Sequence, residues 1–286
     1  MPHAARIASQ WLIAALIAGL ASFANAGNLP SAGDVPYGPD PAQRFDLYAP
    51  PDATDAPLIL MVHGGGWTRG DKNMSRVVDN KRERWLPFGI AFATLNYRLQ
   101  PVAPPLEQAR DVALALATIQ RNSARFGVDR QNVVLMGHSA GAHLIALLAA
   151  RPELLVEAGA EPPQGFVLLD SGALDVPAIM QNPHYRLYDR AFGDKPADWL
   201  AASPYQQMRR ATAPILAVCS SRRADACPQA RAFVAKAHEF GTKAEVLPLN
   251  LSHGEINQRL GKDPVYTASI ERFISELSGS FSVRLR

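Results

Sequence analysis

The chain has 286 residues, of which 48% are hydrophobic and 19% are charged, and its formal net charge is +3. This length suits one large α/β domain or two small ones, and the apolar fraction is enough for a sizeable core. The Lys and Arg residues form neither a basic run nor a basic-aromatic stripe, which argues against a nucleic-acid partner.

The N-terminal segment predicts export. A weakly basic start precedes an apolar run over residues 11–20, and an A-x-A site follows at residues 24–26. This pattern is typical of a secretory signal peptide, and the apolar run is too short for a comfortable membrane span. We expect residues 1–26 to be removed, so that residues 27–286 form a single periplasmic or secreted domain without stable membrane insertion. An uncleaved anchor is the alternative.

The rest of the chain alternates between apolar runs typical of strands and segments with helical spacing. Strands are expected over residues 44–48, 57–62, 89–98, 133–136, 165–170, 213–219 and 243–249, and helices over residues 104–126, 142–150, 228–240 and 264–277. This alternation predicts an α/β fold with a mostly parallel sheet covered by helices on both faces. Residues 27–42 are expected to form an irregular arm, and residues 171–210 a small insertion of loops and short helices.

The first chemical motif is His63-Gly64-Gly65-Gly66-Trp67, directly after the expected strand at 57–62. Consecutive glycines leave backbone N–H groups bare, and such groups can hold the oxyanion of an acyl-transfer reaction. Gly65 and Gly66 are the candidate donors. A phosphate-binding loop is the rival interpretation, but neither G-x-G-x-x-G nor a G-K-[ST] ending is present. A plain tight turn is the structural alternative.

The second motif, Gly137-His138-Ser139-Ala140-Gly141, joins an apolar strand to an apolar helix. Strand, sharp turn and helix with a serine at the apex form the context of a nucleophile elbow. A side chain at either glycine of this motif would collide with the neighbouring strand or helix. Ser139 is therefore the candidate nucleophile, and the N–H of Ala140 is a third candidate oxyanion donor.

A serine nucleophile needs a base and an orienting acid. Of the seven histidines, His253 is the best placed, because we expect it in a glycine-containing loop after the last strand. The acid should lie between the serine and the histidine in this chain order. Asp225, after the next-to-last expected strand, is the preferred candidate. Asp170 and Asp175 are the alternatives.

Cys219 and Cys227 are the two cysteines of the chain. An oxidising compartment permits a disulfide between them, and Asp225 would lie inside the loop that it closes. We hypothesise that this disulfide holds the acid in place; two free thiols are the alternative. The spacing does not resemble a metal site, and we expect no metal and no cofactor.

In this order, HGGGW, GHSAG, Asp225 and His253 are similar to the α/β-hydrolase superfamily. More narrowly, they resemble the esterase/lipase branch with an HGGGW-type oxyanion loop, which includes carboxylesterases and kynurenine-formamidase-like enzymes. The paired arginines and flanking cysteines of residues 219–227 depart from that branch.

The resemblance implies the α/β-hydrolase fold and a serine carboxylesterase (EC 3.1.1) that cleaves short-chain or aryl esters through an acyl-enzyme. Its substrate would be a small-molecule or polymer-borne ester. An arylformamidase-like amide hydrolase is the first alternative, and a non-catalytic binding protein on the same fold is the second. Acyl specificity and oligomeric state do not follow from the sequence.

Overall fold

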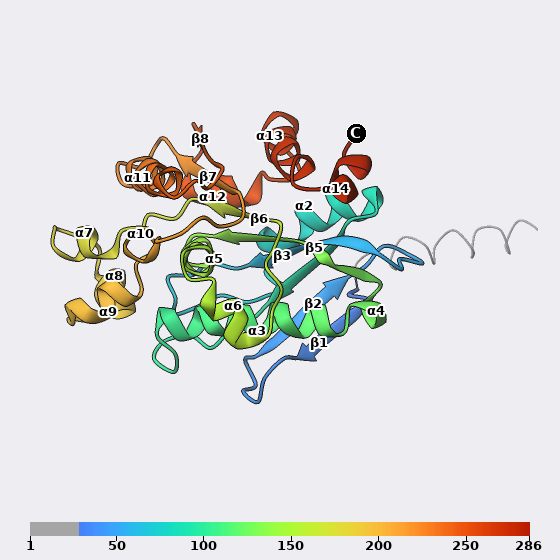
Figure 1. Cartoon of the computed structure of the whole chain (residues 1–286), viewed down its shortest axis with the longest axis horizontal. Helices are drawn as coiled ribbons and strands as arrows, with labels where there is room; N and C mark the ends of the chain where they lie inside the picture. Colours follow the sequence, from blue (N-terminus) through green and yellow to red (C-terminus); the bar gives the residue numbers. More distant parts are fainter. Residues whose placement is uncertain (1–28) are drawn as a thin grey trace, which may run out of the picture.

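The computed structural model describes residues 29–286, and the expected signal peptide lies outside the described residues. Within these residues the centre is an eight-stranded sheet with the order β1-β2-β4-β3-β5-β6-β7-β8 (Figure 1). The strands are β1 (Ala32–Pro36), β2 (Arg44–Tyr48), β3 (Ala56–Val62), β4 (Ala91–Leu95), β5 (Val128–His138), β6 (Gly165–Leu169), β7 (Ile215–Ser220) and β8 (Ala244–Leu249). β2 runs antiparallel to both of its neighbours, and every pair from β4 to β8 is parallel. The predicted α/β fold with a mostly parallel sheet is confirmed.

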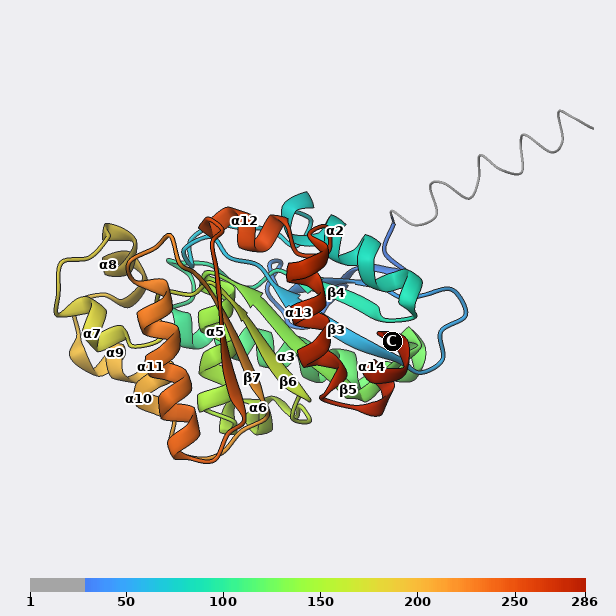
Figure 2. The same ribbon diagram turned by 90° about the horizontal axis from the view of Figure 1, so that it is seen from above.

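Helices cover both faces of this sheet (Figure 2). One face carries α3 (Pro105–Arg121), α5 (Ala140–Ala150) and α11 (Ala226–Glu239), and the other carries α2 (Ser75–Trp85), α13 (Pro264–Ser275) and α14 (Gly279–Arg284). The shorter helices α4 (Ser123–Phe126), α6 (Glu153–Ala158), α12 (His253–Gln258) and the 3-10 turn η1 (Leu86–Phe88) complete these layers.

The central strand β3 explains why its sequence is an unbroken apolar run. Leu58 and Leu60 belong to the core beneath α3 and α5, whereas Ile59 and Met61 belong to the core beneath α2 and α13. Successive side chains of a strand point to opposite faces, so a strand with helices on both sides has no polar position. All seven residues of β3 are buried.

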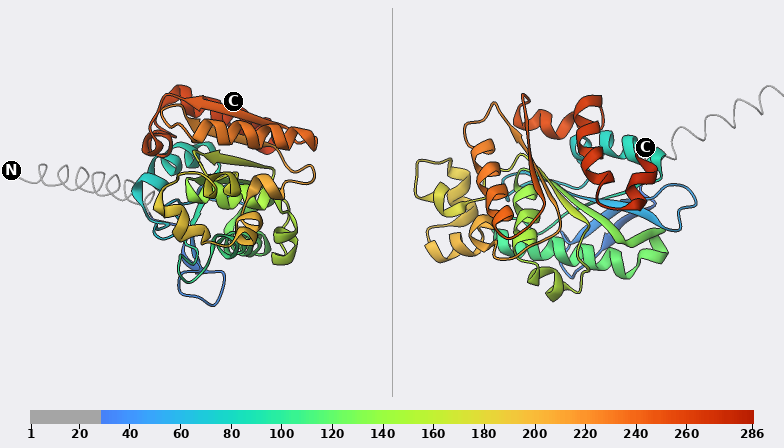
Figure 3. Two further views of the ribbon diagram at one scale, coloured as in Figure 1. Left: turned by 90° about the vertical axis from the view of Figure 1, so that its left-hand side faces the viewer. Right: turned by 45° about the horizontal axis from the view of Figure 1, so that its top comes forward.

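Residues 171–210 form the expected insertion. Its short helices are α7 (Val176–Met180), α8 (Arg186–Phe192), α9 (Pro196–Ala201) and α10 (Pro204–Gln207). They gather at one end of the molecule, where α10 contacts α5 and α11 (Figure 3). α9 and α10 each begin with a proline, and α7 has one at its second residue; proline suits the first turn of a helix. These helices are too short to show an amphipathic period, which is why the sequence reads as irregular.

Two segments differ from the prediction. Residues 32–36, expected in an irregular arm, form β1, an edge strand whose pairing with β2 is irregular between Ala32 and Val35. Edge strands tolerate glycine and proline. The glycine and proline of β1 are the reason why the sequence suggests an irregular segment here. His253 and Gly254, expected in a loop, begin α12 (His253–Gln258), because Ser252 and Glu255 make a capping box at its start.

Among residues 29–286, no helix has both the length and the apolar character needed to cross a membrane.

Candidate active site

Ser139 lies on the turn between β5 and α5, with φ 57° and ψ −118°. Side chains other than glycine rarely adopt a positive φ, and strain of this kind is typical of a nucleophile elbow. A Cβ on Gly141 would lie 2.2 Å from the carbonyl oxygen of Val62, and one on Gly137 would lie 2.5 Å from that of Gly141. Gly141 therefore lets the turn approach β3 closely and Gly137 lets β5 approach α5, as the sequence predicts.

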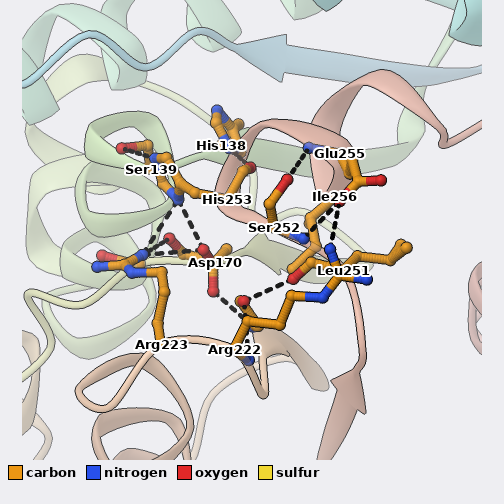
Figure 4. Close-up of polar contacts among 12 residues, drawn as sticks. His138, Ser139, Asp170, Arg222, Arg223, Leu251, Ser252, His253, Glu255 and Ile256 are labelled. Carbon is orange, nitrogen blue, oxygen red and sulfur yellow. Dashed lines mark hydrogen bonds and ion pairs between the residues drawn. The ribbon is translucent and has the colours of Figure 1, made fainter.

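His253 lies opposite this serine, with its Nε2 3.0 Å from Ser139 Oγ (Figure 4). It is the first residue of α12, and the capping box of Ser252 and Glu255 fixes the start of that helix. The ring is positioned from its other side by Asp170, whose Oδ2 lies 2.6 Å from His253 Nδ1. In the tautomer that suits both contacts, Nδ1–H donates to the carboxylate and Nε2 accepts from the hydroxyl.

Asp170 directly follows β6 and its side chain is 0% exposed. Its Oδ1 accepts the backbone N–H of Ser220 at 2.7 Å, and its Oδ2 accepts from Arg223 Nη1 at 2.8 Å. Burial would raise the pKa of Asp170, but hydrogen bonds from His253, Ser220 and Arg223 outweigh it and hold the pKa at about 2. The carboxyl group is therefore ionised at neutral pH.

The prediction that Asp225 orients His253 is wrong. Asp225 Oδ2 accepts from Arg223 Nη2 at 2.9 Å, and the side chain is 39% exposed. Asp175, the other alternative, accepts the N–H of Ala178 at the start of α7.

The sheet register explains why Asp170 occupies the place expected for Asp225. Leu169 of β6 pairs with His138 of β5, and Ser139 N–H donates to the Leu169 carbonyl at 2.9 Å. Asp170 is therefore level with the serine on the adjacent strand, whereas Asp225 follows β7, one strand farther away. Strand order was the missing information; its sequence signal is an aspartate directly at the end of the strand that follows the elbow.

Arg223 is a fourth group at this site and was not anticipated. Its Nη1 lies 2.8 Å from Asp170 Oδ2 and 3.1 Å from His253 Nδ1 (Figure 4). Its Nη2 donates to Asp225. A disulfide joins Cys219 to Cys227 and closes the turn that carries Arg223. The predicted disulfide is thus present, but the residue inside its loop that reaches the Ser–His–Asp constellation is the arginine.

The glycine loop after β3 lies against the serine turn, since a Cβ on Gly64 would be 2.8 Å from Ser139 Cβ. Gly65 and Gly66 have φ angles of 124° and 61°, and in the part of the chain that the structure describes their N–H groups donate to no acceptor. Ala140 is the first residue of α5, where N–H groups have no partner within the helix. Gly65 and Gly66 therefore lie in a loop that meets the serine turn at Gly64, Ala140 directly follows Ser139, and none of the three amides is engaged among the described residues.

A buried histidine, His143, links the glycine loop to α5 and to the insertion. His143 Nδ1 accepts from Trp67 Nε1 at 3.2 Å, and its Nε2–H donates to the Ala202 carbonyl at 2.8 Å. Burial lowers the pKa of His143 to about 4, so the ring stays neutral and keeps both roles. The glycine loop, α5 and the insertion are thereby joined through one side chain.

Among residues 29–286, no group of three or more His, Cys, Asp or Glu residues is arranged to hold a metal ion.

Comparisons with known proteins agree with this architecture. Residues 45–158 match the BD-FAE family. Esterase LipC of Mycobacterium tuberculosis is 30% identical over 218 residues, which cover 70% of this chain and 53% of LipC. The probable isoprenylcysteine alpha-carbonyl methylesterase ICMEL1 of Oryza sativa subsp. japonica is 35% identical over 114 residues, which cover 39% and 26% of the two chains. The structure of Thermogutta terrifontis esterase 2 phosphonylated by sarin aligns with a TM-score of 0.71 at 22% identity, over 87% of this chain and 96% of that one.

The chain shares the α/β-hydrolase fold of this esterase. It spans about a quarter to a half of the length of the curated relatives it matches, 26% of the rice protein and 53% of LipC. The match to the BD-FAE family includes the glycine loop and the serine turn, but ends before Asp170 and His253.

Proposed function

We propose that this α/β-hydrolase is a serine carboxylesterase that cleaves esters through Ser139, His253 and Asp170. One observation carries the proposal: a continuous chain of polar contacts from Ser139 Oγ through both ring nitrogens of His253 to the buried Asp170, with 3.0 Å and 2.6 Å at its two steps. This is the arrangement that turns a serine hydroxyl into a nucleophile.

The reaction follows from the roles of these groups. His253 Nε2 removes the hydroxyl proton as Ser139 Oγ attacks the ester carbonyl, and Asp170 stabilises the imidazolium that forms. The N–H groups of Gly65, Gly66 and Ala140 bind the resulting oxyanion. His253 then protonates the leaving alcohol, and water activated by the same nitrogen hydrolyses the acyl-enzyme.

The relatives support ester hydrolysis as the reaction class. LipC is named an esterase and the rice protein a probable methylesterase, and the sarin adduct belongs to an esterase of the same fold. Small-molecule or polymer-borne esters are the proposed substrates.

Export to the periplasm or the exterior is part of the proposal. The leader pattern of residues 1–26 supports it, as does the Cys219–Cys227 disulfide, because such bonds persist in oxidising compartments. N-terminal sequencing of the protein from an extracellular fraction tests it, with a start at Gly27 as the expected result.

The decisive experiment is active-site labelling with a fluorophosphonate, followed by intact mass and peptide mapping. We expect one adduct, on Ser139, and none in Ser139→Ala. A folded wild-type protein that takes up no label would overturn the proposed function. Rates on p-nitrophenyl esters and on an arylformamide then separate ester from amide hydrolysis, and we expect the esters to be cleaved faster.

A further inference from the structure

We propose that Arg223 is a positioning residue of this site: its guanidinium fixes Asp170 toward His253 and sets the pH range of the reaction, and the Cys219–Cys227 disulfide holds the turn that presents it. The inference rests on the proposed function, and the tests below separate the two.

The first step is the way in which Asp170 is held. A carboxylate removed from water stays ionised only when charges or hydrogen bonds compensate for the lost solvent. Two of the groups that do so, the Ser220 N–H and the Arg223 guanidinium, come from the segment between Cys219 and Cys227. The turn closed by the disulfide therefore supplies two of the donors that bind the Asp170 carboxylate.

The second step is the shape of the surrounding backbone. A Cβ on Gly172 would lie 2.7 Å from Asp225 Oδ2 and 2.8 Å from Arg223 Nη2. The chain just after Asp170 thus packs directly on the Arg223–Asp225 ion pair, and a side chain at position 172 would displace it. The Arg223 side chain is 24% exposed, so this charge is partly shielded from solvent.

The third step is electrostatic. When His253 Nδ1 carries the proton that it donates to Asp170, Arg223 Nη1 cannot donate to the same nitrogen. Once Nε2 is protonated as well, the 3.1 Å contact is a repulsion between two positively charged groups. Arg223 therefore opposes formation of the imidazolium, whereas Asp170 favours it. Asp225, on the far nitrogen of the guanidinium, offsets part of the arginine charge. The three side chains together present a net charge of −1 to the ring.

Other titratable groups near the ring do not carry this effect. Burial lowers the pKa of His138 to about 3 and raises that of Tyr188 to about 12, so both stay neutral where the enzyme would work. Lys81 of α2 donates to Asn257 of α12, and because it is unchanged in every variant below, it contributes equally to all of their pH profiles. Arg222 and Glu255 pair with each other on the exposed side of α12.

The test is the pH dependence of kcat/KM in charge variants. In Arg223→Gln the ring faces two carboxylates without the cation, so the acid limb should move to higher pH, by about one unit for a charge at this range. In Asp225→Asn the offsetting carboxylate is gone, and the limb should move to lower pH by a smaller amount, since Asp225 is partly exposed. We also expect Arg223→Gln to lose about tenfold in kcat/KM, as is usual when a residue that orients a reactive group is removed. Arg223→Lys should recover part of this loss.

Arg222→Gln is the matched control. It removes the same charge from the same turn, but Arg222 contacts Asn250 and Glu255 and is 50% exposed. We expect its acid limb to coincide with that of the wild type. Shifts of the same sign in Arg223→Gln and Asp225→Asn, or an unmoved limb in Arg223→Gln, would overturn the inference.

The disulfide is tested in the same assay. Reduction of Cys219–Cys227, verified by intact mass, should lower kcat/KM in the wild type and have a smaller effect in Arg223→Gln, because the turn acts through an arginine that is already absent. Equal losses of kcat/KM on reduction of the two proteins would show that the disulfide does not act through Arg223. Fluorophosphonate labelling of wild-type Ser139 keeps the outcomes distinct: without labelling the proposed function fails, and with labelling a failed pH test counts against Arg223 alone.

Discussion

His138 donates its Nε2–H to the backbone carbonyl oxygen of His253 at 2.9 Å, and the two rings lie 4.6 Å apart. The residue that precedes the serine thus holds the first turn of the helix that carries His253, the proposed base. Because burial lowers the pKa of His138 to about 3, the ring remains a neutral donor across the working range. The elbow and α12 are joined by this bond as well as by the Ser139–His253 contact.

Replacing His138 by leucine should therefore misplace His253 without changing its chemistry. We expect kcat/KM to fall about tenfold, as for loss of an outer partner, and the pH profile to keep its shape. His138→Gln, which keeps an N–H donor, should retain more activity. Equal losses in both variants would show that the bond to the His253 carbonyl has no part in positioning.

The identity of the acid can be decided by two asparagine variants. Asp170→Asn should lower kcat by about four orders of magnitude, because an amide no longer selects the tautomer in which Nε2 accepts from the serine. Asp225→Asn keeps that tautomer, and its loss should stay below about tenfold. Steady-state rates at the pH optimum give the answer, with circular dichroism to check folding. The opposite ranking would return the acid role to Asp225.

The ionised Asp170 should also be visible in stability. Its pKa is lowered from 3.8 to about 2, so its contribution is complete above pH 4 and is lost as the pH falls toward 2. The size is about 2 kcal/mol, from the constant that relates pKa shifts to free energy. The difference in unfolding free energy between the wild type and Asp170→Asn should shrink over this interval. A constant difference would contradict the stabilised carboxylate.

The buried Lys81 should make the free energy of unfolding depend on pH between neutral and alkaline values. Burial lowers its pKa from 10.5 to about 7, while its amino group contacts the carbonyl and the side-chain oxygen of Asn257. Between pH 7 and pH 10.5 the unfolded chain holds this proton more firmly than the folded one, so Lys81 makes stability rise with pH. Denaturant unfolding of the wild type and Lys81→Met should therefore diverge across that range, with the wild type gaining. If the unfolding free energies of the two proteins changed in parallel with pH, the pKa of Lys81 would not be lowered in the folded state.

The serine and the histidine were predictable because each depends on a local signal. Ser139 follows an apolar strand, precedes an apolar helix and is flanked by glycines, and a strained turn of this kind is fixed by its own few residues. His253 required only the order of the last strand and the loop after it. Even there the sequence showed Ser252 and Glu255, the capping box that makes the segment a helix.

The acid was not predictable from the same evidence. Asp170 and Asp225 each follow a strand, and the choice between them depends on β6 lying next to β5. Strand order is a property of the whole sheet, so the position of Asp170 directly after β6 marks it as a candidate without deciding between the two aspartates. The role of Arg223 is harder still to foresee, since it follows from where a disulfide-closed turn meets the end of another strand.

The link through His143 limits how the substrate range of this protein can be altered. Trp67, which follows the three glycines, contacts His143 and also lies 5.0 Å from Phe192 of the insertion. The insertion and the loop proposed to hold the oxyanion therefore share one aromatic cluster. An engineer who replaces residues 171–210 to admit a bulkier ester also removes the support of Trp67. Grafts that keep Phe192 and the Ala202 carbonyl should retain turnover, whereas wholesale exchange of the segment should sacrifice catalysis along with specificity.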